Sequence, residues 1–231
     1  MELFLIRHGQ STNNALTDWT LRVEDPPLTE SGQRQADCAA RHLAAGRHLL
    51  PDARETARPL LDRLYCSPMI RAMQTAQPIG ALLGVTPEVW VDIHEAGGIY
   101  LDHGERKIGY PGRTRRELAE LFPDYVLPHA LSDQGWWNRE FEEAHQAHAR
   151  ALVVAQALRE RAAEDARVGV VSHGDFLSAL LKALAEQHPG EGPYYEHRNT
   201  GITHIDLTPQ GARVRYLNRI DHLDDEALIT Y

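Results

Sequence analysis

Two histidines in this chain each end a short apolar run, and a glycine follows each of them. The two stretches are Leu3-Phe4-Leu5-Ile6-Arg7-His8-Gly9 and Val168-Gly169-Val170-Val171-Ser172-His173-Gly174. Such runs are typical of strands buried on both faces, and ligands bind at the carboxyl ends of the strands of an α/β sheet. We therefore expect His8 and His173 to face one crevice, with Gly9 letting the backbone approach a ligand closely.

A third and a fourth strand end bring an arginine and a carboxyl group to the same edge. Leu64-Tyr65-Cys66 is predicted to be a strand, and Ser67-Pro68 after it predicts a helix with serine as N-cap and proline as first residue. Arg71 then lies in or just after the first turn, near backbone amides that favour anions. The strand predicted over residues 88–93 is followed by Glu95, the carboxyl group placed to act as an acid.

Two arginines, two histidines and one carboxyl group suit phosphoryl transfer. The transferred group carries its charge on three equatorial oxygens, so catalysis rests on positioning and electrostatic clamping, for which arginine's planar fork is well matched. A neutral imidazole can attack phosphorus, and a carboxylic acid can protonate the leaving alkoxide and later take a proton from water. With Arg7, Arg71 and a protonated His173 meeting the charge, the reaction is predicted to need no metal and no cofactor.

Four stretches carry these residues in a recurring order. They are Leu5-Ile6-Arg7-His8-Gly9-Gln10-Ser11, Leu28-Thr29-Glu30-Ser31-Gly32-Gln33-Arg34-Gln35-Ala36, Ser67-Pro68-Met69-Ile70-Arg71-Ala72-Met73-Gln74-Thr75-Ala76 and Ser172-His173-Gly174-Asp175. Together they resemble the motifs of the histidine phosphatase superfamily, the phosphoglycerate-mutase-like group. The resemblance covers most of residues 1–95 and 168–207.

The resemblance implies a three-layer α/β/α fold around a mostly parallel sheet. It also implies that His8 is the phosphorylated nucleophile and that Glu95 is the proton donor. The residues expected to hold the phosphoryl oxygens are Arg7, Arg71 and His173, and the further substrate contacts expected are Asn14, Gly9 and Gly174.

Composition and charge are those expected of a soluble enzyme that acts on a small anionic substrate. The 231 residues are 42% hydrophobic and 25% charged, and no linker divides them, so we expect one domain over residues 1–231. The net charge of −9 argues against a nucleic-acid surface, whereas a few arginines can still attract a phosphorylated metabolite locally. No secretory signal, membrane span or metal-type cysteine spacing is present, so a cytoplasmic protein is expected. The oligomeric state stays open.

Several further elements are predicted around the strand ends. A helix is expected to begin at Thr29 and to end at Gly46, and Pro78 is expected to kink or divide the helix that carries Arg71. A long helix is predicted from Asn138 to about Asp165. A hairpin is predicted from residues 202–207 and 212–217, whereas residues 47–62 are ambiguous, with a short helix inside a long connection.

Residues 97–137 are predicted to form a lid or specificity insertion. The segment is rich in glycine, aromatic and basic residues, as long binding loops often are. A capping box at Thr114 predicts one helix inside it, and Trp136-Trp137 is more simply explained as core.

Three functions are open at this point: a phosphatase acting on a small phosphate monoester, a phosphoglycerate mutase, and a non-catalytic phosphate-binding protein. The intact set of a nucleophile, an acid and cationic residues disfavours the last. In mutases of this family an arginine follows the acid directly, whereas Ala96-Gly97-Gly98 follows Glu95 here and leaves room for water. A basic pair, Arg115-Arg116, lies in the predicted helix. P-loop, GxGxxG and GxSxG motifs are absent, and His145 and His148 are better explained as a solvated helix face than as a metal site.

Overall fold

A six-stranded sheet forms the centre of the protein, of which the computed structural model describes residues 1–54 and 58–231. The strand order is β3-β2-β6-β1-β7-β8. The strands are β1 (Glu2–Arg7), β2 (Arg63–Cys66), β3 (Pro87–Val89), β6 (Arg167–Ser172), β7 (Ile202–Thr208) and β8 (Gly211–Arg219). The first four run parallel, β7 is antiparallel to β1, and β8 is antiparallel to β7.

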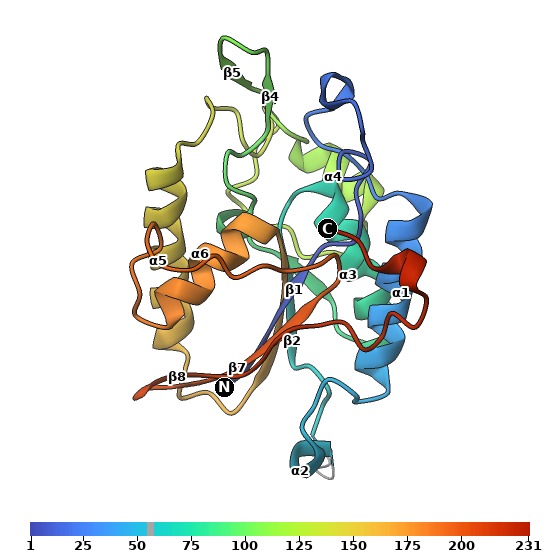
Figure 1. Cartoon of the computed structure of the whole chain (residues 1–231), viewed down its shortest axis with the longest axis vertical. Coiled ribbons are helices and arrows are strands. Elements are labelled where there is room, and N and C mark those ends of the chain that lie inside the picture. The colour runs from blue at the N-terminus through green and yellow to red at the C-terminus, as the bar shows by residue number, and fades with distance from the viewer. Residues whose placement is uncertain (55–57) are drawn as a thin grey trace.

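Helices cover both faces of the sheet, as the three-layer prediction required. The helices α1 (Glu30–Ala44) and α3 (Ile70–Leu83) lie on one face, and α5 (Ala144–Glu160) and α6 (Gly174–Leu184) lie on the other (Figure 1). The strand β1 serves both layers because its side chains alternate. Phe4 and Ile6 pack in the apolar cluster with α1 and α3, whereas Leu3 and Leu5 pack in the cluster with α5 and α6.

The smaller elements lie in the connections. They are α2 (Pro51–Arg54), α4 (Arg115–Leu121), the two-stranded hairpin of β4 (Tyr100–Asp102) and β5 (Lys107–Gly109), and the 3-10 helices η1 (Trp19–Leu21), η2 (Val91–Ile93) and η3 (Glu226–Leu228). The β4–β5 hairpin and the turn that contains η1 rise together at the top of Figure 1, at the carboxyl ends of the parallel strands. The short helix expected within residues 47–62 is α2, and residues 55–57 of that segment lie outside the described residues.

The helix α3 differs from its prediction in two ways. It is continuous through Pro78, so the proline does not divide the helix. The packing of α3 against α1 and the sheet holds the helix together although proline cannot donate its backbone bond. Its N-cap is Met69 rather than Ser67. The Ser67 hydroxyl is instead bonded to the Met69 amide and to His173, so it belongs to the strand-end edge.

Two other secondary-structure elements have boundaries that differ from the prediction. The strand β3 ends at Val89 and continues as η2 rather than as a strand to Ile93. The helix α5 begins at Ala144, six residues after the predicted start at Asn138. Asn138 has a φ of 41°, which a helix does not allow, and Glu143 supplies the capping box with Gln146.

The helix α5 also ends at Glu160 rather than near Asp165. The predicted caps, the terminal hairpin and the buried tryptophan pair were confirmed. Thr29 caps α1 through Gly32, and Thr114 forms its capping box with Glu117. The terminal hairpin is β7–β8, and Trp136 and Trp137 are buried in the core.

Candidate active site

The ring of His8 is buried at the end of β1 and is held in its neutral form. His8 follows β1 directly and is 3% exposed. Its Nδ1 lies 2.6 Å from the carbonyl oxygen of Gly9, so Nδ1 carries the proton, and Nε2 accepts a hydrogen bond from Nε of Arg71 at 3.1 Å. Burial, assisted by the charges of Arg71 and Arg7, holds the pKa of His8 well below its ordinary value. The lone pair of Nε2 therefore faces the cations at the sheet edge.

Arg71 and Arg7 present two guanidinium groups to that edge. Nη1 of Arg71 lies 3.9 Å from Oδ1 of Asp25, and burial raises the pKa of the Asp25 carboxyl to about 6 against the opposing charge of Arg71. Nη1 of Arg7 donates to the carbonyl of His197 at 2.6 Å, while its buried Nε has no hydrogen-bond partner among the described residues. Both groups keep donors for the oxygens of an anion.

His173 lies beside His8 as expected, and its charge differs from the expectation. The two ring centroids are 5.0 Å apart, and Nε2 of His173 lies 2.8 Å from the hydroxyl oxygen of Ser67. Burial, with Arg71 and His8 as further causes, holds the pKa of His173 well below its ordinary value. The expected protonated imidazole is therefore neutral in this environment, and the fixed positive charge comes from the arginines.

Glu95 lies at the amino end of α6. Its Oε1 accepts from the backbone amides of Ala96 at 2.9 Å and Phe176 at 3.0 Å, and its Oε2 faces the amide of Asp175 at 3.5 Å. Burial and the nearby charge of Asp175 raise the pKa of Glu95, while Arg71 and the two amides oppose them. A carboxyl group with a raised pKa beside two arginines is suited to donate a proton.

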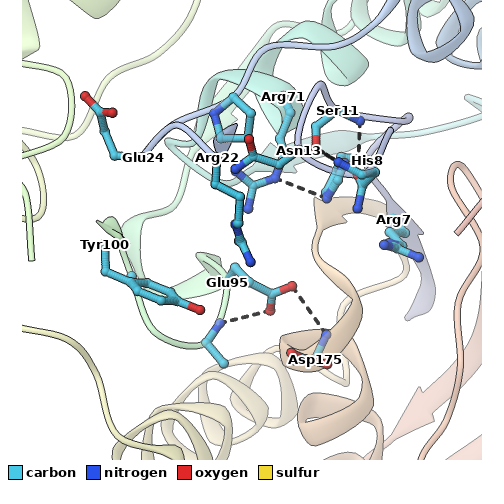
Figure 2. A pocket seen from close by; sticks show the side chains of 14 residues that line it. Arg7, His8, Ser11, Asn13, Arg22, Glu24, Arg71, Glu95, Tyr100 and Asp175 are labelled. Carbon is cyan, nitrogen blue, oxygen red and sulfur yellow. Dashed lines mark hydrogen bonds between the residues drawn. The ribbon is translucent and has the colours of Figure 1, made fainter. Parts of the chain in front are cut away.

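Arg7, His8, Arg71 and Glu95 line one cavity of about 190 Å³, whereas His173 is fully buried and is not among its lining residues. Figure 2 shows Arg7, His8 and Arg71 on one side of it and Glu95 and Asp175 on another. This volume is below the roughly 300 Å³ at which drug-sized pockets begin, which fits a phosphoryl group with a small or protruding leaving group. The other lining residues are Ser11, Asn13, Asn14, Arg22, Glu24, Pro26, Ala96, Gly98 and Tyr100.

Sequence reasoning missed several residues of this cavity. Arg22 points toward Glu95 from the turn after η1 (Figure 2), and it forms no ion pair within residues 1–54 and 58–231. Tyr100 reaches the cavity from β4. Neither belongs to a strand-end motif, so no local signal marked them. Asp175 was marked by the His-Gly-Asp stretch, and its Oδ1 accepts from the Tyr194 hydroxyl at 2.8 Å.

The predicted substrate-binding residues divide into two groups. Asn14 lines the cavity, and its Oδ1 is held by the amide and hydroxyl of Ser11 at 3.0 and 2.8 Å, so Nδ2 is the atom left for a ligand. Gly9 and Gly174 do not line it. A Cβ on Gly9 would lie 2.5 Å from the carbonyl oxygen of Gly32, so close packing on α1 explains this glycine, whereas Gly174 lies beside the guanidinium of Arg7.

The segment 97–137 contributes little charge to the cavity. Its contacts there are Gly98 and Tyr100. Arg115 donates to the carbonyls of Leu127 and Pro128, and Arg116 pairs with Glu120 on the surface. Gly98 has a φ of 73°, and a Cβ there would lie 2.3 Å from the Trp137 ring, so packing and backbone conformation both require glycine beside the acid.

The described residues, 1–54 and 58–231, contain neither a metal-binding cluster nor a membrane-spanning helix. No group of three or more His, Cys, Asp or Glu side chains is arranged to hold a metal ion there, His145 and His148 included. No helix in residues 1–54 or 58–231 combines the length and apolarity needed to cross a bilayer.

Known proteins resemble this chain in sequence and in fold. Residues 3–220 match the family model of the histidine phosphatase superfamily, branch 1. A 6-phosphofructo-2-kinase/fructose-2,6-bisphosphatase of Caenorhabditis elegans is 28% identical over 84% of the chain and 36% of its own length. The curated relatives are much longer, since the chain spans 15% to 36% of their lengths.

Two solved structures share the fold. A phosphoserine phosphatase mutant of Entamoeba histolytica, in complex with phosphoserine, aligns with a TM-score of 0.61 and 21% identity over 96% of this chain and 98% of that one. A putative α-ribazole-5′-phosphate phosphatase of Escherichia coli aligns with a TM-score of 0.63 and 19% identity over 95% and 98%. At these identities the likeness concerns the fold.

Proposed function

Because the chain belongs to the histidine phosphatase superfamily, a family of enzymes that hydrolyse phosphate monoesters, we propose that it hydrolyses a small phosphorylated metabolite through a phosphohistidine on His8. One observation carries the proposal above the others. The Nδ1 proton of His8 is bound to the Gly9 carbonyl, so the lone pair of Nε2 is directed at Arg71, in the cavity that also holds the protonatable Glu95.

The first half-reaction forms the phosphoenzyme. Arg7 and Arg71 bind the equatorial oxygens, and the Nε2 lone pair of His8 attacks phosphorus as the bond to the ester oxygen breaks. Protonated Glu95 gives its proton to the departing alkoxide, and becomes a carboxylate held by the amides of Ala96 and Phe176. Positive charge develops on the imidazole, and the Gly9 carbonyl stabilises it through Nδ1–H.

The second half-reaction releases phosphate. A water molecule on the Glu95 side attacks phosphorus, the carboxylate of Glu95 takes its proton, and the bond to Nε2 breaks with its electron pair returning to His8. Phosphate leaves, and both groups regain their starting protonation states. The two arginines stay charged throughout, because guanidinium does not lose its proton in proteins.

Hydrolysis is favoured over a mutase reaction by the surroundings of Glu95. A mutase must hold a second anionic group while its intermediate reorients. The basic residues of segment 97–137 lie outside the cavity, where Arg113 and Arg116 are in ion pairs and Lys107 stacks on Phe141. Of the described residues that line the cavity, Arg22 is the one cation besides Arg7 and Arg71, and it lies exposed on a turn rather than fixed beside Glu95 by an ion pair.

The test measures phosphate release and isomerisation side by side. A panel of phosphorylated metabolites and p-nitrophenyl phosphate is screened for free phosphate. In parallel, 3-phosphoglycerate is supplied with catalytic 2,3-bisphosphoglycerate, and 2-phosphoglycerate is followed. We expect phosphate release to dominate. Isomerisation much faster than phosphate release would replace the phosphatase by a mutase, and no turnover of any ester would leave a phosphate-binding protein.

A further inference from the structure

The hydroxyl of Thr230 joins two buried amide side chains. It accepts a hydrogen bond from Nε2 of Gln35 at 2.8 Å, and it donates one to Oδ1 of Asn199 at 2.9 Å. Gln35 and Asn199 are both fully buried, so neither amide has water as an alternative partner. One hydroxyl thus uses its donor and an acceptor position to fix which way each amide faces.

The far ends of both amides hold the backbone around His8. Oε1 of Gln35 accepts from the amide of Gln10 at 2.7 Å. Nδ2 of Asn199 donates to the carbonyl oxygen of His8 at 3.0 Å. If Asn199 turned its amide over, its Oδ1 would face the His8 carbonyl, and two acceptors would repel each other.

The neighbouring backbone is held in a conformation that needs such support. Thr200 is a β-branched residue with a φ of 57°, a region that such residues rarely enter. Its amide points at the carbonyl oxygens of Arg7 and His8 at 3.1 and 3.3 Å. Strain of this kind persists where surrounding contacts enforce it and is concentrated at functional sites.

Thr230 lies outside the part of the chain that matches the family model, which ends at residue 220. The segment around Thr230 is nevertheless hydrogen-bonded to Gln35 and Asn199, the two residues that contact the backbone around His8. Nε2 of Gln35 also donates to the carbonyl oxygen of Leu228 at 2.7 Å. The backbone amide of Asn199 donates to the carbonyl oxygen of Thr230 at 3.0 Å. A segment more than 200 positions from His8 in sequence is therefore linked to the His8 carbonyl through one side chain, that of Asn199.

We propose that Thr230 is a positioning residue for the nucleophile: by orienting Gln35 and Asn199 it holds the peptides of His8 and Gln10 from both sides and so aims Nε2 of His8 at phosphorus. The inference rests on the proposed phosphohistidine mechanism. It assigns a catalytic purpose to the segment beyond residue 220, and it requires the attack step, rather than binding of the phosphoryl group, to depend on Thr230.

Thr230→Val tests this, because valine has nearly the same shape and neither donates nor accepts a hydrogen bond. We expect the single-turnover rate of phosphoenzyme formation to fall about 10-fold or more, since a misplacement of about 1 Å at a reacting atom can reduce a rate about 100-fold. The KM and the Kd for inorganic phosphate should change less than about 2-fold, because the arginine clamps are untouched. Thr230→Ser should restore the rate to within about 3-fold of the wild type.

A matched control separates positioning from loss of stability. Thr208→Val makes the same change at an exposed hydroxyl in the β7–β8 turn, and its rate should equal that of the wild type. Asn199→Ala combined with Thr230→Val should slow the reaction no more than the slower single variant, because both act through one network. Each rate is measured well below the thermal midpoint of the variant concerned.

Two results would overturn the inference. One is a Thr230→Val enzyme that forms phosphoenzyme within about 2-fold of the wild-type rate. The other is a slowed variant that Thr230→Ser does not rescue. If the wild type hydrolyses esters without forming a phosphoenzyme, the proposed phosphohistidine mechanism is wrong. That result is obtained before any variant is made, so it is distinguished from failure of the inference about Thr230.

Discussion

Lowering the pH from 7 to 5 should destabilise the fold strongly, because several histidines are buried in the neutral form. Burial lowers the pKa of His48 to about 3, that of His222 to about 3 and that of His197 to about 4. Below pH 6.5 the unfolded chain binds protons at these side chains and the folded chain does not. Stability is therefore lost as the pH falls through 6.5, and the loss continues until the folded pKa values are reached.

The size of the effect follows from these pKa values. At pH 5 the unfolded state gains about 2 kcal/mol for each of the three histidines relative to pH 7, since one pKa unit corresponds to about 1.4 kcal/mol. Asp25 acts in the opposite sense, because its raised pKa of about 6 means that the folded state binds more protons between pH 3.8 and 6. Protonation of Asp25 in the folded state offsets about 1 kcal/mol of this loss of unfolding free energy. The net loss from these four groups is about 5 kcal/mol, a large part of the roughly 5–15 kcal/mol of a typical protein.

Urea unfolding at pH 7 and pH 5, followed by tryptophan fluorescence, measures this loss. His48→Phe should reduce the difference between the two pH values by about 2 kcal/mol. His145→Gln changes an exposed histidine and should leave the difference as it is. Equal unfolding free energies at the two pH values, or a difference that His48→Phe does not reduce, would refute the reasoning.

Three further outcomes are expected. Glu95→Gln should slow hydrolysis of an alkyl phosphate about 100-fold or more and that of p-nitrophenyl phosphate about 10-fold or less, because only the alkoxide needs a proton; equal losses in steady-state assays would make Glu95 structural. Activity should survive exhaustive EDTA treatment, whereas loss that a divalent ion restores would revive a metal site. Gly98→Ala should lower the unfolding free energy by about 1–3 kcal/mol more than Gly104→Ala. Both glycines have a positive φ, but a Cβ at Gly98 meets the Trp137 ring, whereas a Cβ at Gly104 meets nothing within 4 Å. Equal losses of unfolding free energy in urea would contradict this.

The layers and the strand ends could be predicted from the sequence because each leaves a local signal. Short apolar runs ending in His-Gly mark β1 and β6, and these strands are adjacent and parallel, in register from Glu2 with Arg167 to Arg7 with Ser172. Caps at Thr29 and Thr114 mark helix starts, since a side-chain oxygen binding a free amide depends on residues three positions apart.

What the sequence did not predict depends on contacts between distant segments. Pro78 ends no helix, because tertiary packing outweighs the missing bond. Arg22 reaches the cavity from the turn after η1 and Tyr100 from β4, and the β4–β5 hairpin has strands of only three residues each. The neutral state of His173 follows from burial, which becomes visible only once the layers are assembled.

The central claim is that His8 carries the phosphoryl group during turnover. The enzyme is mixed with an ester that it hydrolyses and is quenched in alkali within one turnover. The phosphorylated residue is then located by mass spectrometry. We predict an acid-labile phosphoryl group on His8, absent in His8→Ala, together with loss of activity in that variant. A phosphoryl group on His173, or substantial activity retained by His8→Ala, would contradict it.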